Sequence, residues 1–252
     1  MDIFDGFLFG LIQGLTEFLP VSSSGHLLIA GRLLGYTPDV AFELVAHLGT
    51  LLALILVLYK PLFSLVRHPL SVKTRFVLLA TAVTAAVFLA DERFFRYAAD
   101  GKFLATGFLL TAVLLTLAHF LPKRSRAMGW LDAVVIGFAQ GAAGLPGLSR
   151  SGTTVSTARL LGVDRKESTE FSFLLAVPVI LGSAAYEMLG GGFGQLALWP
   201  SVVCFATSFV TGLLTLKLCL KLFASDNAVY FAVYLALLGT FFLINDAFLH
   251  II

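Results

Sequence analysis

An arginine stands in a short polar stretch, residues 146–154, that interrupts an otherwise apolar part of the chain. In a membrane protein such a charge is costly, and it usually faces a partner or a water-filled cavity. Arg150 offers a planar fork of N–H donors that matches phosphate oxygens. A helix that starts at Gly152 would add unpaired backbone amides and the positive end of its dipole. The stretch therefore predicts a site for phosphate groups, with candidate binding residues Gly147, Ser149, Ser151 and Thr154.

A second set of polar residues lies near the N-terminus, at Gln13, Glu17, Ser22, Ser23, Ser24 and His26. Gln13 and Glu17 are four positions apart and share one face of a helix. Ser23 and His26 lie within one helical turn, and a hydroxyl beside an imidazole with a carboxylate nearby can act as nucleophile and base. We therefore predict catalytic roles for Glu17, Ser23, His26 and Arg150, and binding roles for Gln13, Ser22 and Ser24.

Glu17 and His26 each have a purely structural alternative. Glu17 would then only neutralise the charge of Arg150, because an acid within an apolar helix needs a partner. His26 would only bond to a carbonyl near the start of its helix. We favour chemistry because an acid, hydroxyls and an imidazole occur together.

Four other ionisable residues are expected to be structural. His47 and His119 lie within apolar stretches and have no hydroxyl or acid cluster beside them in the sequence. Glu43 and Glu170 stand near the starts of two apolar stretches, where a carboxylate favours the helix N-terminus. We expect both glutamates to cap their helices.

The two polar stretches are copies of each other. When the chain is shifted by 127 positions, residues 10–35 align with residues 137–162 without a gap, and ten of the 26 positions are identical. About two identities would be expected by chance in so apolar a composition. Internal repeats indicate two related halves, which we place at residues 1–121 and 127–252 of a single domain, 1–252.

The composition is that of an integral membrane protein. Hydrophobic residues make up 58% and charged residues 13% of the chain, and the mean hydropathy is +0.94. The net charge of +2 is not gathered into a basic stripe, which argues against a nucleic-acid partner. Cys204 and Cys219 lie in apolar runs and are expected to be buried. The N-terminus lacks the basic region of a cleavable signal, so we treat the whole chain as mature.

The apolar stretches predict an all-α polytopic fold of six spans and two broken helix pairs. A crossing needs about 20 apolar residues, and we place the spans at 40–59, 76–90, 103–121, 168–189, 199–218 and 227–249. Two remaining regions are too short or too polar to cross alone, which predicts re-entrant helix-loop-helix pairs. They are placed at 3–19 with 25–34 and at 130–144 with 152–161. The charged segments 60–75 and 91–102 are expected to be loops.

Lysine and arginine gather in alternate connections, which predicts the orientation of the chain. Twelve of the 17 lie in the segments 60–75, 122–126, 159–166 and 217–226, which we place inside the cell. Four lie in the segments placed outside, which are 1–2, 31–39, 91–102, 190–198 and the C-terminus; Arg150 is the last. The first broken pair then enters from outside and the second from inside, so the halves form an inverted-topology repeat. Such repeats place a substrate site at their interface, where the two polar loops should meet and open toward the outside.

The motifs of both halves resemble those of the bacterial undecaprenyl pyrophosphate phosphatase family. The resemblance rests on the residues from Gln13 to His26 and from Pro146 to Thr154, and the number of apolar spans agrees over essentially the whole chain. It implies an enzyme that hydrolyses undecaprenyl pyrophosphate to undecaprenyl phosphate plus inorganic phosphate. The reaction recycles the lipid carrier for cell-wall synthesis and underlies bacitracin resistance. The resemblance also implies catalysis or phosphate binding by Glu17, Ser23, His26, Ser149, Arg150 and Thr154.

The same resemblance implies a cofactor, a partner and a location. A divalent cation, Mg²⁺ or Ca²⁺, is expected to bridge the phosphates, with Glu17 as its protein ligand. Gln13 departs from the family pattern, because many relatives carry a second Glu there, and this weakens a two-carboxylate metal site. The partners are the polyprenyl pyrophosphate lipid and membrane lipids, and a homodimer is kept open. The location is the bacterial inner membrane, with the active site facing the periplasm or exterior.

A transporter or flippase of polyprenyl phosphate is the alternative function. Inverted repeats with broken helices are transporter architecture. A carrier needs an anion site but neither a nucleophile nor a base, so Ser23, His26 and Glu17 favour the phosphatase. Phosphate release by the purified protein would separate the two.

Overall fold

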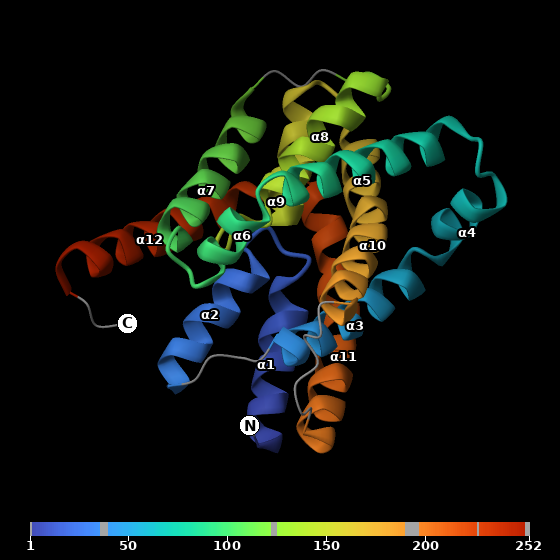
Figure 1. Ribbon diagram of the computed structural model, residues 1–252. Helices are drawn as coiled ribbons and strands as arrows, with labels where there is room; N and C mark the ends of the chain where they lie inside the picture. Colours follow the sequence, from blue (N-terminus) through green and yellow to red (C-terminus); the bar gives the residue numbers. More distant parts are fainter. Residues whose placement is uncertain (1, 36–39, 122–124, 190–196, 226, 250–252) are drawn as a thin grey trace.

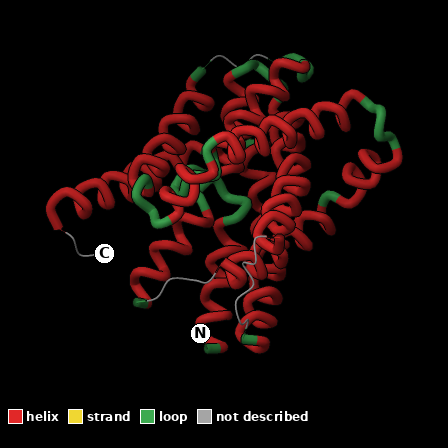
Figure 2. The backbone as a smooth tube through the Cα atoms, viewed as in Figure 1, coloured by secondary structure: helices red, strands yellow, loops and turns green. Residues whose placement is uncertain are grey.

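The computed structural model describes residues 2–35, 40–121, 125–189, 197–225 and 227–249. These residues form helices joined by turns, with no strand among them (Figure 2). In chain order the helices are α1 (Ile3–Thr16), α2 (Ser23–Leu34), α3 (Val40–Val57), α4 (Tyr59–Arg67), α5 (Val72–Ala90), α6 (Glu92–Ala99), α7 (Leu104–Phe120), α8 (Trp130–Ala142), α9 (Arg150–Leu160), α10 (Arg165–Leu189), α11 (Leu198–Ala224) and α12 (Val229–Ile244). A π-helical turn, Asn245–Leu249, continues α12.

Within the described residues, four helices are long and apolar enough to cross a membrane, namely α5, α10, α11 and α12 with its continuation. Two bent pairs raise the number to six if each counts as one span: α3 with α4, bent by 80°, and α6 with α7, bent by 104°. The six predicted spans correspond to α3, α5, α7, α10, α11 and α12. The prediction of an all-α polytopic membrane protein is confirmed.

Two segments predicted to be loops are short helices instead. In α4, the exposed apolar residues Tyr59, Phe63 and Val66 recur with helical spacing, so the segment is amphipathic. In α6, the Asp91 side chain caps the first turn and Arg96 pairs with Glu92 four residues earlier at 2.6 Å. The charged residues of the two segments suggested loops. In α4 and α6 these residues instead lie on the polar face of an amphipathic helix.

The two broken pairs are present and approach each other from opposite ends of the molecule (Figure 1). The chain turns between α1 and α2 around Pro20, and between α8 and α9 around Pro146. The turns lie in the middle of the molecule, where Figure 2 shows loop segments among the helices. Non-helical backbone at this depth is tolerated only where protein or a cavity shelters it.

Each broken pair packs against a long helix of the other half. Helix α1 lies along α11, and α8 lies along α5. The repeat-related glycines Gly10 and Gly137 allow this close approach. A Cβ atom at Gly10 would stand 2.4 Å from the Cys204 carbonyl oxygen, and a Cβ atom at Gly137 would stand 2.6 Å from the Ala80 carbonyl oxygen. Small residues at such interfaces let helices of a membrane protein approach closely. The crossed packing ties the two halves together around the polar loops.

Contacts between connections agree with the grouping by charge. Segments placed on the inner side touch each other through hydrogen bonds from Arg126 to the Leu161 carbonyl (2.8 Å) and from Arg165 to the Ala224 carbonyl (2.9 Å). Segments placed on the outer side touch through Arg32, which donates to the Asp100 carbonyl at 3.0 Å. The side of the membrane that each group faces stays a prediction.

Glu170 does not cap α10, so that prediction is wrong. Its carboxylate pairs with Lys73 of α5 at 2.6 Å. The start of α10 is instead capped by Asp164, whose Oδ1 accepts from the amides of Lys166 (2.9 Å) and Glu167 (3.2 Å). These amides hold the pKa of the Asp164 carboxyl below its ordinary value. The helix begins earlier than the apolar pattern suggested, which moves Glu170 past the first turn.

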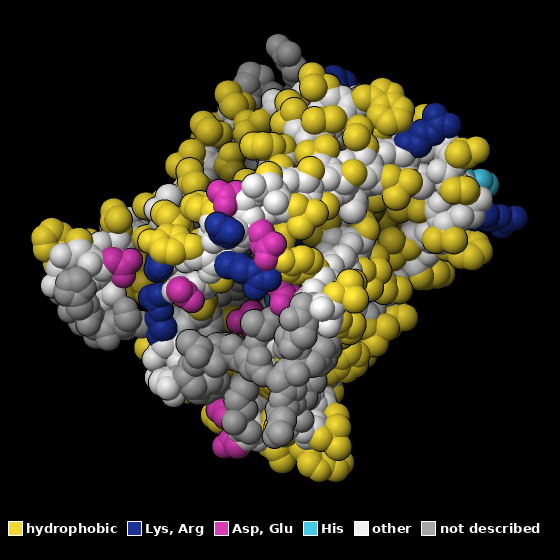
Figure 3. Space-filling model, in the orientation of Figure 1, with side chains coloured by type: hydrophobic (Ala, Val, Ile, Leu, Met, Phe, Trp, Pro, Cys, Tyr) yellow, Lys and Arg dark blue, Asp and Glu magenta, His cyan; other side chains and the backbone are white. Residues whose placement is uncertain are grey.

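Hydrophobic side chains cover most of the face seen in Figure 3, as expected for a surface in contact with lipid. Charged side chains gather near the middle of this face, with smaller groups at its edges.

Candidate active site

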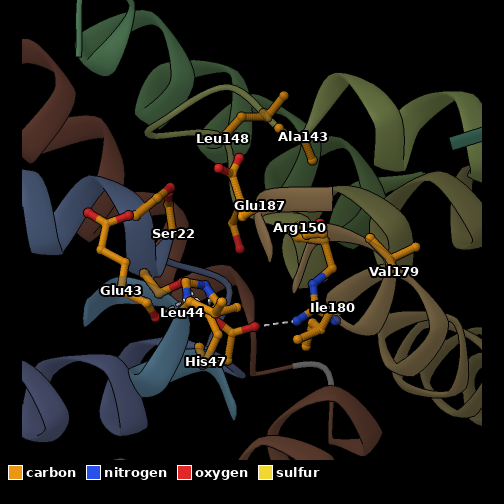
Figure 4. Close-up of a pocket in the computed structure, with 16 residues that line it drawn as sticks. Ser22, Glu43, Leu44, His47, Ala143, Leu148, Arg150, Val179, Ile180 and Glu187 are labelled. Atoms are coloured by element: carbon orange, nitrogen blue, oxygen red, sulfur yellow. Dashed lines mark hydrogen bonds and ion pairs between the residues drawn. The ribbon is translucent and has the colours of Figure 1, made fainter. Parts of the chain in front are cut away.

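A cavity of about 320 Å³ lies where the two broken pairs meet. Its walls come from the turn after α1, the starts of α2 and α9, and the facing sides of α3 and α10. The polar residues that line it are Glu17, Ser22, Ser23, Ser24, Glu43, His47, Ser149, Arg150, Ser183 and Glu187. Figure 4 shows Glu43, His47, Arg150 and Glu187 around one space.

The two polar loops are in direct contact. The Gly147 amide donates a hydrogen bond to Ser22 Oγ at 3.1 Å, and Ser151 Oγ donates to the Leu19 carbonyl oxygen at 3.1 Å. These bonds join residues more than 120 positions apart in the chain. The predicted meeting of the two loops is confirmed.

Both helix starts at the cavity use the same cap. Ser22 Oγ accepts from the Gly25 amide at 3.3 Å, and Ser149 Oγ accepts from the Gly152 amide at 3.2 Å. These two pairs are equivalent positions of the repeat. The first residue of each helix lines the cavity. Two positive dipole ends therefore face the same space and favour an anion between them.

Ser22 is held in a strained conformation. It has a φ of 69°, the one positive φ of a non-glycine residue in the described part of the chain. Such backbone costs about 1–3 kcal/mol and persists when the surroundings fix it. Here the Ser22 hydroxyl is held by the amides of Gly25 and Gly147, and its carbonyl oxygen is bonded to the His26 ring. The strain sets where the loop ends and where the Ser23 hydroxyl points.

Glu17 is the centre of the hydrogen-bond network, and only 7% of its surface is exposed. Its Oε1 accepts from Arg150 Nη2 in an ion pair, marked at Arg150 in Figure 4. Its Oε2 accepts from Ser23 Oγ at 2.7 Å and from Gln13 Nε2 at 2.9 Å. A buried carboxylate requires such partners. The ion pair with Arg150, which the sequence offered as the structural alternative for Glu17, is present and joins one loop to the other.

One of the two terminal nitrogens of Arg150 has no hydrogen-bond partner among the described residues. This atom is Nη1, which is buried, and the same holds for Gln13 Oε1. A buried donor without a partner costs about 1–3 kcal/mol. An oxyanion in the cavity would satisfy Nη1 while Nη2 holds Glu17. The arrangement is therefore suited to bind a phosphate oxygen.

His26 is not placed beside the Ser23 hydroxyl, so the predicted serine and histidine pair is wrong. Nδ1 of its ring is 2.8 Å from the Ser22 carbonyl oxygen, and Nε2 is 2.7 Å from the hydroxyl of Tyr234 in α12. The ring also stacks on Tyr234, with 5.8 Å between the centroids. The hydroxyl of Ser23 instead donates to Glu17. His26 thus holds the backbone of Ser22 from behind the cavity.

His47 and Glu43 line the cavity from α3, which corrects the structural assignment of His47; Glu43 stands in the first turn of α3, and its capping role stays a prediction. His47 Nε2 is 3.7 Å from Glu17 Oε2. Glu187 of α10, which the sequence analysis did not single out, lines it too. The signal that could have found His47 is its spacing of four from Glu43, which puts two polar groups on one face of an apolar span. His119 lies elsewhere, edge-on against the Phe120 ring.

The remaining predicted binding residues divide into two groups. Ser24 and Ser149 line the cavity. Gln13, Gly147, Ser151 and Thr154 lie behind it and do not line it. Thr154, for example, is fully buried and bonds to the Arg150 carbonyl oxygen at 2.8 Å and to Ser172. Residues of the second group position the loops, and those of the first face a ligand.

Gly147 is expected to be required for the shape of this site. It has a φ of +89°, and a Cβ atom there would stand 2.3 Å from the Leu104 carbonyl oxygen. Gly147→Ala should displace the loop, break its bond to Ser22 and lower the melting temperature in detergent by several degrees, at about 2–4 °C per kcal/mol. Gly182→Ala is the control, because nothing lies within 4 Å of its added Cβ. Equal melting temperatures of the Gly147→Ala and Gly182→Ala proteins would contradict the requirement for glycine at position 147.

These features define the class of protein. It is a polytopic all-helical membrane protein with a polar cavity built from two broken helix pairs. The chain belongs to the family of the bacitracin resistance protein BacA, whose model matches residues 6–241.

Curated relatives of this chain carry the name undecaprenyl-diphosphatase. The protein from Carboxydothermus hydrogenoformans is 33% identical over 98% of this chain and 98% of its own length. Those from Bacteroides fragilis and Christiangramia forsetii are both 35% identical, over 95% of this chain and 96% of their own lengths. The similarity therefore covers both halves and both polar loops. The family suggested by the motifs of the sequence is confirmed.

Proposed function

We propose that this protein hydrolyses undecaprenyl diphosphate to undecaprenyl phosphate and inorganic phosphate. The observation that carries the proposal is the joined cluster of Arg150, Glu17 and Ser23 at the meeting of two helix N-termini. The names of the relatives support the substrate and the reaction. The apolar faces of α3 and α10 beside the cavity, with Leu44, Val179 and Ile180, suit the first part of a prenyl chain.

In this proposal Arg150 and the two helix starts bind the phosphate groups. The terminal phosphate would take the unpaired Nη1 of Arg150 and the dipole ends of α2 and α9. Phosphoryl transfer asks a protein chiefly to position the groups and to stabilise charge on the phosphate oxygens. Donors fixed in a buried site do this well because they need no rearrangement.

Ser23 and Glu17 supply the reactive pair. Glu17 Oε2 accepts a hydrogen bond from Ser23 Oγ, with 2.7 Å between the two oxygens. Glu17 can therefore remove the Ser23 proton as Ser23 Oγ attacks the terminal phosphorus. The bond between that phosphorus and the bridging oxygen breaks, and undecaprenyl phosphate leaves. Water then releases inorganic phosphate from Ser23. In the alternative version Glu17 and Ser23 position a water molecule that attacks directly.

The residues present do not fit a divalent cation on Glu17. Both of its oxygens already accept from protein donors, which are Arg150, Ser23 and Gln13. No group of three or more His, Cys, Asp or Glu side chains among the described residues could hold a metal ion. The requirement for Mg²⁺ or Ca²⁺ stays a proposal, in which the cation arrives on the oxygens of the diphosphate itself.

Phosphate release by the purified protein tests the function. The protein in detergent should release phosphate from undecaprenyl diphosphate, and the assay should be run with Mg²⁺, with Ca²⁺ and with a chelator. Transport of a polyprenyl phosphate across a vesicle membrane without phosphate release would favour the flippase instead.

We further propose that the protein lies in the bacterial inner membrane with its active site toward the periplasm or exterior, because the charge count places the first broken pair on that side. A cysteine at Asp100 should react with an impermeant thiol reagent in intact cells, and a cysteine at Lys166 should not. Both positions are exposed, and the native Cys204 and Cys219 are buried. Labelling at Lys166 but not at Asp100 would reverse the orientation.

A further inference from the structure

His47 approaches the carboxylate of the reactive pair from α3. Its Nε2 stands 3.7 Å from Glu17 Oε2, the oxygen to which Ser23 donates. Both residues line the cavity, and the His47 side chain is 29% exposed against 5% for Glu17, so His47 is the more open of the two to water. The position of His47 in α3 is one helical turn from Glu43.

The backbone fixes which nitrogen of His47 carries the proton. Nδ1 is 2.8 Å from the carbonyl oxygen of Glu43. A carbonyl oxygen only accepts hydrogen bonds, so Nδ1 must be the donor and carry the hydrogen. In the neutral ring Nε2 then has no hydrogen and offers its lone pair toward Glu17. It is therefore ready to accept a proton.

The other groups around Glu17 cannot take this role. Gln13 does not titrate, and Arg150 stays charged. Both ring nitrogens of His26 are engaged, by the Ser22 carbonyl oxygen and by Tyr234, and His26 does not line the cavity. Of the described side chains that contact Glu17, His47 is therefore the one that can take its proton.

Charged groups from four parts of the chain face the cavity that His47 lines. Glu17 from the turn after α1, Glu43 from α3 itself and Glu187 from α10 bring carboxylates to the same cavity. Arg150 from α9 brings the opposing positive charge. Helix α11, which also packs on α3, presents the uncharged Ser208 against Gly49. Three carboxylates thus face one guanidinium and one imidazole.

We infer that His47 is a proton relay for Glu17, an inference that rests on the proposed phosphatase function. The Ser23 proton moves to Glu17 as the bond from Ser23 Oγ to phosphorus forms and the bridging bond breaks. Glu17 passes the proton to Nε2 of His47, and the imidazolium releases it to water through its exposed edge. Glu17 is then again a carboxylate, and it can accept a proton from the water that hydrolyses the phosphoserine. His47 acts through Glu17 and is a positioning residue in this scheme.

The test compares His47→Gln with the wild-type protein in phosphate release across pH 5–9. General acid–base groups commonly contribute about 10²–10⁴ in rate, and we expect a loss of about 10 to 10² in kcat for a relay one group removed. The KM should change little, and the pH profile of the rate should differ from that of the wild type. His68→Gln is the control, because His68 is exposed beyond the end of α4. It should retain the wild-type profile.

His47→Ala provides a second measurement, in which added imidazole should restore part of the lost rate by entering the cavity. If the wild-type protein is active and the His47 variants have the same kcat, the relay is wrong and the proposed function stands. The same conclusion follows if the variants lose kcat but keep the wild-type pH profile and are not rescued by imidazole. A wild-type protein that releases no phosphate would overturn the proposed function and the relay with it.

Discussion

Replacing Arg150 by alanine is expected to reduce phosphate release by about 10²–10³ or more, because one fixed donor to a developing oxyanion is commonly worth that much. Arg150 here supplies two things at once, an unpaired Nη1 for the phosphate and an ion pair through Nη2 with Glu17. The alanine variant loses both. It also leaves the buried carboxylate of Glu17 without its cation, so part of the loss will be structural.

Arg150→Lys separates the two contributions. A lysine keeps the charge but presents a single ammonium, which cannot hold Glu17 and a phosphate oxygen with two arms at once. We expect this variant to fold like the wild type and to recover only a small part of the activity. Arg32→Ala, which changes an exposed arginine at the end of α2, should leave phosphate release unchanged. Wild-type turnover in Arg150→Lys would show that the site needs only a positive charge.

The second large effect is expected at Ser23. If Ser23 Oγ attacks the phosphorus, the rate of phosphate release by Ser23→Ala should fall to background. A phosphoserine should then be trapped in the wild type but not in the variant. If Ser23 only positions water, a measurable rate should persist with the same pH dependence. The hydrogen bond of 2.7 Å to Glu17 favours the first version, since it places the base on the nucleophile.

Glu17→Gln tests the partner of Ser23. The amide keeps the size of the side chain and loses the base, so we expect a loss of about 10²–10⁴ with a weaker dependence of the rate on pH. Ser64→Ala, at an exposed serine of α4, is the control for both substitutions. A fully active Ser23→Ala protein would remove Ser23 from both versions and leave Glu17 to activate water.

The sequence by itself determined the class, the helical architecture and the meeting of the two loops. Charges are rare in so apolar a chain, and Glu17 and Arg150, each set within an apolar region, must each find a partner. With two copies of one motif, the pairing between copies was therefore predictable. The glycines, prolines and serines that break the helices also follow directly from local backbone chemistry.

Only the tertiary structure decided which side chains share the cavity. Sequence spacing put His26 one turn from Ser23, but its two ring nitrogens bond the Ser22 carbonyl oxygen and the hydroxyl of Tyr234. His47 is 30 positions from Glu17 in the sequence and reaches it because α3 packs beside α1. In a span that is apolar on nearly every face, periodicity does not tell which face looks inward. That rotation is set by packing between helices, and packing decides here which histidine meets the acid.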